Sequence, residues 1–285
     1  MRDDFAVFIL THGRPDRVWT EKTLERCGYT GRLYYVIDNQ DDTEAEYYER
    51  YGDSVIKFSK PEVAKYTDSM DMGNDMRVIL YARNACFDIA KQLGLKYFLE
   101  LDDDYDEFRF RIERPKGTLT SVHISDLDRV FEAMLDFLDK SGADTVALAQ
   151  SGDFIGGVGS NVWKKQLARK AMNSFFCRTD KPFKFIGRIN EDVNAYTLLG
   201  SQGKLFLTVA RATLNQKPTQ SNENGMTEVY RKFGTYVKSF YSVIAMPSAV
   251  KVQILNTAHK RIHHKVKWDY CVPQIISDSY RKKRS

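Results

Sequence analysis

The sequence predicts an α/β fold, in which a mostly parallel sheet is flanked by helices and the second half of the chain is less regular. Short apolar runs alternate with amphipathic stretches through the first part of the chain, a pattern typical of right-handed βαβ units. The hydrophobic content of 42% in 285 residues is ordinary for a globular protein with a substantial core. No internal repeat and no linker-like segment interrupt the sequence, so we predict a single domain.

Each apolar run of the first half ends in a polar loop and is followed by a helical pattern. Thr43 precedes one of these patterns and is a suitable N-cap, and Gly94 follows another and is a suitable C-terminal stop. The expected strands are Phe5–Leu10, Arg32–Ile37, Val55–Phe58 and Lys96–Leu101, and the expected helices are Trp19–Cys27, Glu44–Tyr51 and Val78–Leu93.

The alternation weakens after the fourth strand. We expect helices at Asp126–Ser141 and near Glu191–Leu199, strands at Thr145–Gln150, Met172–Arg178 and Lys204–Val209, and loops at Ser151–Ser160 and Gln216–Gly225. The first of these loops is rich in glycine, but no clear strand and helix flank the glycines as a dinucleotide-binding fingerprint requires. We interpret it as a flexible binding or lid loop.

Positive charge gathers at the C-terminal end of the chain. The net charge is +5 overall, whereas Lys251–Ser285 alone has nine Lys and Arg against two Asp, so the preceding residues are slightly acidic. Such an asymmetry indicates a phosphate-rich partner such as nucleic acid. A solvated chain end is the alternative interpretation.

The sequence predicts neither a membrane span nor a disulfide framework. No apolar run reaches the ~18 residues of a membrane span, and the N-terminus lacks the order of a signal peptide. The four cysteines are far apart and include no C-x-x-C pair, so we expect reduced, buried thiols and a cytoplasmic protein.

An acidic loop follows the fourth expected strand. Asp102, Asp103, Asp104, Asp106 and Glu107 place five carboxylates in six positions. These groups repel one another unless a cation is present, and hard ions such as Mg²⁺ or Mn²⁺ choose oxygen ligands. Open α/β sheets bind ligands at the carboxyl ends of their parallel strands, where this loop begins. The sequence therefore predicts a metal site here, with a solvated acidic turn as the alternative.

The acidic loop, the strand before it and the helical segment with Arg83-Asn84-Ala85 together resemble glycosyltransferases of the GT-A type. The resemblance implies a nucleotide-sugar donor, which we expect to be a UDP-sugar, and a divalent metal ion that bridges its diphosphate. By this resemblance Asp104 would ligate the metal, and Asp102 would lie near the ribose or the metal, with Asp103 beside the donor.

The resemblance also implies further donor contacts. Asp38 matches the acidic position that contacts the nucleotide base, and Thr11 and Arg14 lie in the loop that touches the nucleotide. Arg83 would reach the diphosphate, with a surface salt bridge as the alternative.

Asn190-Glu191-Asp192 resembles a second element, the x-Glu-Asp sequence of inverting GT-A enzymes. There a carboxylate removes the proton of the acceptor hydroxyl. We expect Asp192 to be this base, assisted by Glu191, and the reaction to invert the anomeric centre. The alternative is that both carboxylates only complement the N-terminus of a helix.

Late histidines form a third candidate group. Many GT-A enzymes supply a histidine as a further metal ligand, and the resemblance implies that His263 or His264 of the His259-x-x-x-His263-His264 segment does so. On a basic helix these side chains would equally face solvent or bind phosphate.

Ile9–Pro15, Leu101–Tyr105 and Asn190–Val193 resemble, more narrowly, the TET-associated glycosyltransferases of bacteriophages. The resemblance covers about residues 5 to 265 and implies a DNA acceptor, namely the hydroxymethyl group of a modified pyrimidine. It divides the single domain into a nucleotide-sugar-binding half (1–107), an acceptor and catalytic half (108–250) and a basic tail (251–285).

Other functions stay open at this point. The aromatic side chains of Tyr230, Phe233, Tyr236, Phe240 and Tyr241 would stack on an exposed base or simply form core. A GT-A enzyme with a saccharide or protein acceptor would share every donor residue. A non-catalytic DNA-binding module would explain the basic tail but not the acidic loop.

Overall fold

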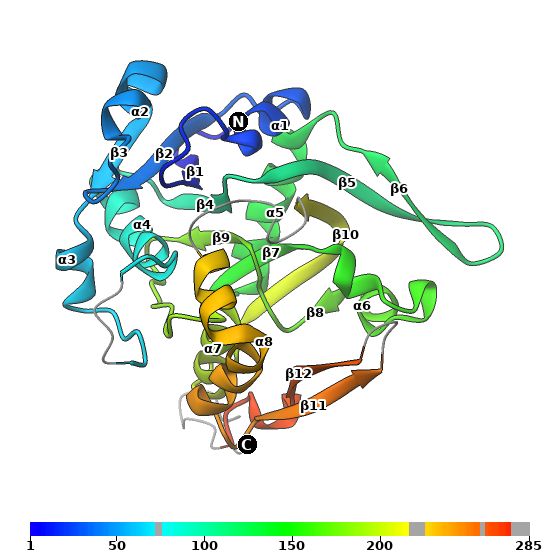
Figure 1. The fold of residues 1–285 in the computed structure, drawn as a ribbon. Helices are drawn as coiled ribbons and strands as arrows, with labels where there is room; N and C mark the ends of the chain where they lie inside the picture. Colours follow the sequence, from blue (N-terminus) through cyan, green and yellow to red (C-terminus); the bar gives the residue numbers. More distant parts are fainter. Residues whose placement is uncertain (72–75, 217–225, 257–259, 275–285) are drawn as a thin grey trace, which may run out of the picture.

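A central sheet of ten strands organises the computed structural model, which describes residues 1–71, 76–216, 226–256 and 260–274 (Figure 1). Its strand order is β3-β2-β1-β4-β9-β7-β10-β5-β6, with β8 paired to β10. A separate hairpin of β11 and β12 lies beside the long helix α8.

The first half of the chain forms the parallel part of the sheet. Strands β1 (Phe5–Leu10), β2 (Arg32–Asp38), β3 (Val55–Phe58) and β4 (Tyr97–Asp102) are joined by α1 (Trp19–Arg26), α2 (Glu44–Tyr51), η1 (Gly52–Ser54), α3 (Lys60–Ala64) and α4 (Leu80–Gln92). The predicted strands and helices of this half are confirmed to within one or two residues at each end. Leu10 lies opposite both Val36 and Asp102, so the segments after β1, β2 and β4 leave the sheet at the same edge.

The second half extends the sheet with strands of both directions. Strand β9 (Ser174–Arg178) lies between β4 and β7 (Thr145–Ala149) and is antiparallel to both, so β7 runs in the direction of β4. Strand β10 (Phe206–Gln216) is parallel to β7. Because only β5, β8 and β9 oppose the common direction among the described strands, the prediction of a mostly parallel sheet is confirmed.

Several elements of this half were not predicted. Strands β5 (Tyr105–Arg114) and β6 (Thr118–His123) form a hairpin that projects from the body of the molecule (Figure 1). The other additions are η2 (Ser151–Phe154), η3 (Gly157–Gly159), α6 (Asn161–Lys165), β8 (Leu167–Ala168), α8 (Met226–Ala245) and η4 (Trp268–Tyr270). The expected loop at Gln216–Gly225 lies outside the described residues except for Gln216, which ends β10.

The start of the expected basic tail is a β-hairpin. Strands β11 (Val250–Asn256) and β12 (Lys260–Val266) pair in antiparallel register and contact α8. His263 and His264 therefore lie on a strand, and the expectation of a helix for this segment is wrong. Alternating Ile262, His264 and Val266 give the period of two that favours a strand. Residues 275–285 lie outside the described part of the chain.

Apolar side chains fill both faces of the sheet. One cluster joins β1, β2 and β4 to α1 and α5 (Leu127–Ser141), and includes Leu24, Phe131 and Leu135. The other lies under α4 and α7 (Glu191–Ser201) and includes Phe87, Phe98 and Val193. Each strand buries alternate residues on opposite faces, which fixes which side chains reach which helix layer.

Local signals explain some of the helix ends. Gly94 has φ +68° and ends α4, as predicted. Thr43 is the N-cap residue of α2, as predicted, but its side chain makes no capping bond, because its hydroxyl donates instead to Asp41 Oδ1 at 2.6 Å. At α5 the capping residue is Asp126, which accepts from the backbone N–H of Arg129.

Two further expectations concern thiols and membranes. All four cysteines are buried and free of disulfide bonds, as predicted. Among the described residues, no helix combines the length and apolar character needed to cross a membrane.

Candidate active site

The acidic loop between β4 and β5 is bound to the loop that follows β1. Asp103 is buried, accepts a hydrogen bond from Thr11 Oγ1 at 2.8 Å and forms an ion pair with Arg14 Nε at 2.9 Å. Burial raises the pKa of Asp103, while Arg14 and Thr11 oppose the rise. Thr11, Arg14 and Asp103, each of which we expected near the donor, therefore lie together and bind one another. Asp103 is a support for the loop rather than an open ligand.

Asp104 keeps a less compensated charge. Gln216, at the end of β10, donates to both of its carboxylate oxygens at 2.9 and 3.1 Å. Burial and the neighbouring Asp102 and Asp103 together raise the pKa of Asp104 to about 7. A cation beside Asp104 would reverse this rise, because it favours the charged carboxylate.

Arg83 lies at the centre of a buried ionic network. Its guanidinium is 2.9 Å from Asp102 Oδ1, 3.2 Å from Glu191 Oε1 and 3.5 Å from Glu100 Oε2. Its side chain is only 2% exposed and lies over the rings of Phe175 and Phe185. The surface salt bridge that was the alternative interpretation of Arg83 is therefore wrong.

The network joins three segments that are distant in sequence. Arg83 comes from α4, Glu100 and Asp102 from β4, and Glu191 from the start of α7. Burial opposes the charge of Arg83, but Asp102, Glu191 and Glu100 outweigh it and raise its pKa. Arg83 therefore positions the acidic loop relative to the Asn190-Glu191-Asp192 element.

The Asn190-Glu191-Asp192 element begins α7, as predicted. Asn190 has a positive φ of 55°, and its side-chain amide donates to Lys238 O and Ser242 Oγ of α8. Burial raises the pKa of Glu191 to about 7, with Asp192 adding to the rise and Arg83 opposing it. Asn190 thereby fixes the start of α7 against α8.

Asp192 is buried, and the positive charges of Lys170 and Lys238 act on its carboxylate. Burial raises the pKa of Asp192, and the Val193 backbone N–H, which donates to Oδ1 at 2.6 Å, opposes the rise together with Arg83 and the two lysines. Lys170 itself pairs with Asp153. A buried carboxylate with a raised pKa is well suited to accept a proton near neutral pH.

Asp38 and its neighbours form a second polar group at the same sheet edge. Asp38 Oδ2 is 2.8 Å from His12 Nδ1 and 3.0 Å from Lys60 Nζ, and the backbone N–H of Gln40 donates to Oδ1. Burial favours the neutral acid, but the hydrogen bonds from His12 and Lys60 outweigh it and lower the pKa of Asp38. Asp38 is thus held as a carboxylate.

The two late histidines, His263 and His264, are neighbours on β12. Their rings stack with centroids 4.3 Å apart, and the Nδ1 atom of His264 is buried without a hydrogen-bond partner. Burial, with the charges of His263, Lys238 and Lys170, lowers the pKa of His264 to about 4. Within the described ranges, no three His, Cys, Asp or Glu side chains gather closely enough to hold a metal ion.

The model of the TET-associated glycosyltransferase family matches residues 5–225 of this sequence. The chain belongs to this family. It is therefore a glycosyltransferase, and the predicted GT-A fold class is confirmed. A search of curated proteins gives no match.

This glycosyltransferase is similar in structure to two proteins of known structure. Glucosyl-3-phosphoglycerate synthase from Mycobacterium tuberculosis, in complex with Mg²⁺ and uridine diphosphate, matches with 10% identity and a TM-score of 0.45 over 92% of this chain and 87% of that chain. S. aureus TarS matches with 12% identity and a TM-score of 0.43 over 75% of this chain and 37% of that chain.

Several side chains of the candidate site were missed from the sequence. Their partners are far away in the chain, so no local pattern marks them. They are His12 and Lys60 beside Asp38, Gln216 beside Asp104, Glu100 beside Arg83, and Lys170 near Asp192. A signal existed only for Glu100, an acid in the middle of an otherwise apolar strand, which requires a buried partner.

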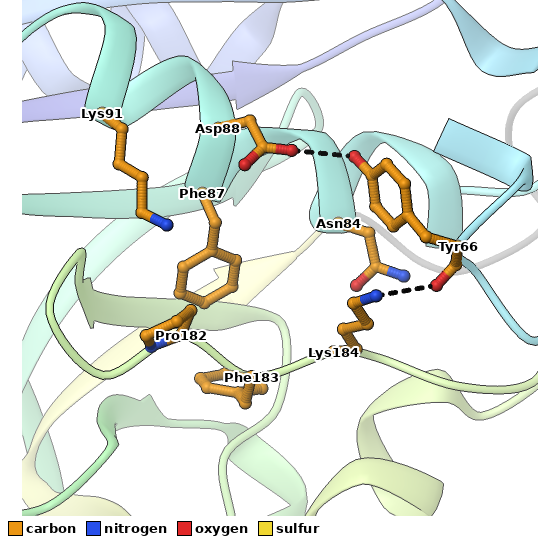
Figure 2. A pocket seen from close by; sticks show the side chains of 8 residues that line it. All are labelled: Tyr66, Asn84, Phe87, Asp88, Lys91, Pro182, Phe183 and Lys184. Carbon is orange, nitrogen blue, oxygen red and sulfur yellow. Dashed lines mark hydrogen bonds between the residues drawn. The ribbon is translucent and has the colours of Figure 1, made fainter. Parts of the chain in front are cut away.

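A pocket of about 250 Å³ lies beside Asn84, the residue that follows Arg83 in α4, and none of the predicted site residues lines it. Figure 2 shows Tyr66 bonded to Asp88 and Lys184 bonded to the carbonyl of Tyr66 at its rim. Asn84 lines this pocket and is bonded to Phe185 through both ends of its side-chain amide. Arg83 and Asn84 thus connect α4 to two different parts of the second half of the glycosyltransferase.

Proposed function

We propose that this glycosyltransferase transfers a sugar from a UDP-sugar to the hydroxymethyl group of a modified pyrimidine in DNA, with a divalent metal ion, and inverts the anomeric centre. One observation carries the proposal: Arg83 ties the acidic loop to the start of α7, so that the predicted donor and base residues share one edge of the sheet. We place the reaction in the cytoplasm.

Asp38 supports the donor half of the proposal. Its carboxylate is held charged at the end of β2, next to the loop with Thr11 and Arg14. A charged acceptor at this position suits the ring N–H of a uracil, while Lys60 and His12 keep it in place. Arg83 is buried among three carboxylates, so it would contribute by positioning Asp102 rather than by contacting the diphosphate.

The carboxylates of Asp102 and Asp104 fit a hard divalent ion. Asp104 accepts hydrogen bonds from Gln216, and Asp102 accepts one from Arg83 at Oδ1 and one from Tyr105 at Oδ2. Burial and, after it, the charges of Asp102 and Asp103 raise the pKa of Asp104, and a cation beside the carboxylate would oppose this rise. Bound there, Mn²⁺ or Mg²⁺ would stabilise the charge that develops on the leaving diphosphate. His263 or His264 stays a proposed further ligand.

Asp192 supports the chemical step. Its carboxylate would take the proton of the acceptor hydroxyl as the hydroxyl oxygen bonds to the anomeric carbon. The bond from that carbon to the diphosphate breaks on the opposite side, and its electron pair leaves with the diphosphate. General-base assistance of this kind contributes about 3–5 kcal/mol. Glu191, held by Arg83, would orient the base and the acceptor.

The acceptor is tested by direct product analysis. The protein is incubated with Mn²⁺, hydroxymethylated DNA and a panel of nucleotide-sugars, and the digested nucleosides are examined by mass spectrometry. We expect a glycosylated hydroxymethylpyrimidine. Transfer to a saccharide or protein acceptor but not to DNA would refute the DNA acceptor while leaving the donor site unaffected.

The mechanism is tested on the same product. NMR should show an inverted anomeric configuration, and Asp192→Asn should lower kcat by about a hundred- to ten-thousand-fold with donor binding nearly unchanged. Glu191→Gln is the matched control and should cost less. A retained configuration, or an Asp192→Asn enzyme that is as fast as wild type, would exclude this base.

A further inference from the structure

We call the edge of the sheet at which β1, β2 and β4 end the catalytic edge. A cationic surface lies beside it and takes no part in the proposed chemistry. It consists of Arg109 and Arg111 on β5, Arg211 on β10, and Lys164 and Lys165 on α6, and we call it the basic face. Arg211, Lys164 and Lys165 are exposed, and Arg109 and Arg111 are half-buried.

Aromatic rings hold the two central arginines of the basic face. The guanidinium of Arg111 lies 4.8 Å from the ring centroid of Phe154, and that of Arg211 lies 4.8 Å from the ring of Trp163. The two rings pack edge to face, 6.4 Å apart. A guanidinium stacked on a ring loses little freedom when it binds a phosphate, because its plane is already fixed.

The charges of Arg111 and Arg211 are not neutralised by acids. Among the residues that the structure describes, neither forms an ion pair with a carboxylate. Burial and the charge of Arg109 lower the pKa of Arg111, and its buried Nε atom has no hydrogen-bond partner. Arg211 Nε donates to the neutral Gln166 at 2.7 Å.

Two carboxylates border the basic face, and neither of them pairs with Arg111 or Arg211. Glu107 pairs with Arg109 at 2.5 Å and lies 3.8 Å from His123 Nδ1, and Glu113 accepts from the indole N–H of Trp163 at 2.9 Å. The five cationic side chains of the basic face outnumber Glu107 and Glu113, so the surface keeps a net positive charge, as a binding surface for a polyanion requires.

The basic face is connected to the catalytic edge by the two strands that carry it. Strand β5 starts directly after Asp104, and β10 runs from Arg211 to Gln216, which binds Asp104. Five residues of extended strand span roughly 17 Å. One DNA strand advances about 3.4 Å per nucleotide, so this distance corresponds to about five nucleotides.

We propose that the basic face binds the phosphate backbone of the acceptor DNA about five nucleotides from the modified pyrimidine. The inference rests on the proposed DNA acceptor and adds the surface that holds it. The stacked arginines contact phosphates without reading bases, so the contact increases affinity without setting the sequence preference.

The experiment compares DNA binding by full-length variants. The double variant Arg111→Gln/Arg211→Gln removes two charges from the basic face, and Arg50→Gln/Arg129→Gln removes two exposed charges from α2 and α5 as the control. Fluorescence anisotropy with a duplex lacking hydroxymethyl groups gives Kd across a salt series. We expect the slope of log Kd against log salt to fall by about two in the first variant and to stay unchanged in the control.

A second variant removes any ambiguity from unfolding. Lys164 and Lys165 are exposed on α6, so Lys164→Gln/Lys165→Gln should leave the melting temperature unchanged and still flatten the salt slope.

The length of the acceptor oligonucleotide gives an independent measurement. Wild-type KM should fall when the oligonucleotide extends more than about five nucleotides beyond the modified base, and the Arg111→Gln/Arg211→Gln enzyme should lack this gain.

The outcomes separate this inference from the proposed function. If the wild-type enzyme glycosylates DNA while both basic-face variants keep its salt slope and length dependence, the surface assignment is overturned and the function stands. If the wild-type enzyme neither binds nor glycosylates DNA, both the DNA acceptor and the basic face as its binding surface are refuted.

Discussion

Replacing Arg83 with methionine should destabilise the protein by about 3–5 kcal/mol, because it leaves buried carboxylates without their cation. The three acids do not contribute equally. Glu100 is fully buried, and burial raises its pKa to about 8, so it is largely protonated at neutral pH and suffers least. The side chains of Asp102 and Glu191 are 19% and 14% exposed, so water would screen part of the repulsion between them once Arg83 is removed.

The assay is urea unfolding followed by circular dichroism, with the m-value as a check that the same surface is exposed. Arg50→Met is the control, since Arg50 is exposed on α2 and surface changes usually stay within about 0.5 kcal/mol. Adding Glu191→Gln to Arg83→Met should recover part of the loss, because it removes a carboxylate that lies 3.2 Å from Arg83, with a coupling of about 0.5–3 kcal/mol. An Arg83→Met protein within about 1 kcal/mol of wild type, or strictly additive single and double variants, would refute the buried network.

Three further predictions concern the site. Asp104→Ala should abolish transfer and the thermal stabilisation by Mn²⁺ while the fold is kept; full activity in EDTA would contradict the metal assignment. Asp38→Ala should raise the donor KM with little change in kcat, because base contacts are similar in the ground and transition states, and steady-state kinetics would show the reverse if Asp38 acted in the chemical step. Raised carboxyl pKa values mean that the native state binds more protons than the unfolded state, so the stability of the metal-free protein should fall as pH rises from about 4.5 to 8. Glu100→Gln should weaken this decline, and an unchanged melting profile across that pH range would contradict the protonated Glu100.

The first half of the fold could be predicted because its signals are local. Strand and helix patterns, Gly94 and the acidic loop all lie within a few residues of the structure that they specify. The β5–β6 hairpin was missed although Phe108, Phe110 and Ile112 alternate with charged residues, because the preceding acids suggested a loop. Its tip is turned by Gly117, whose φ is +72°.

The site could be predicted as a set of residues but not as an arrangement. Asp102 and Glu191 were chosen from short motifs, and the structure joins them through Arg83. The role of Arg83 could not be predicted, because its burial depends on two rings and three acids from separate segments. His12 and Lys60 near Asp38 were missed for the same reason.

The position of β9 between β4 and β7 has a consequence for the division of the chain into halves. A fragment ending near residue 107 would lack β9, so β4 would become an edge strand with unpaired backbone groups and the apolar side chains of Tyr97, Leu99 and Leu101. Long apolar edges pair with other chains and aggregate. We therefore expect the donor-binding half to be insoluble on its own, and attempts to exchange it between related enzymes to succeed only when residues 174–178 are transferred with it.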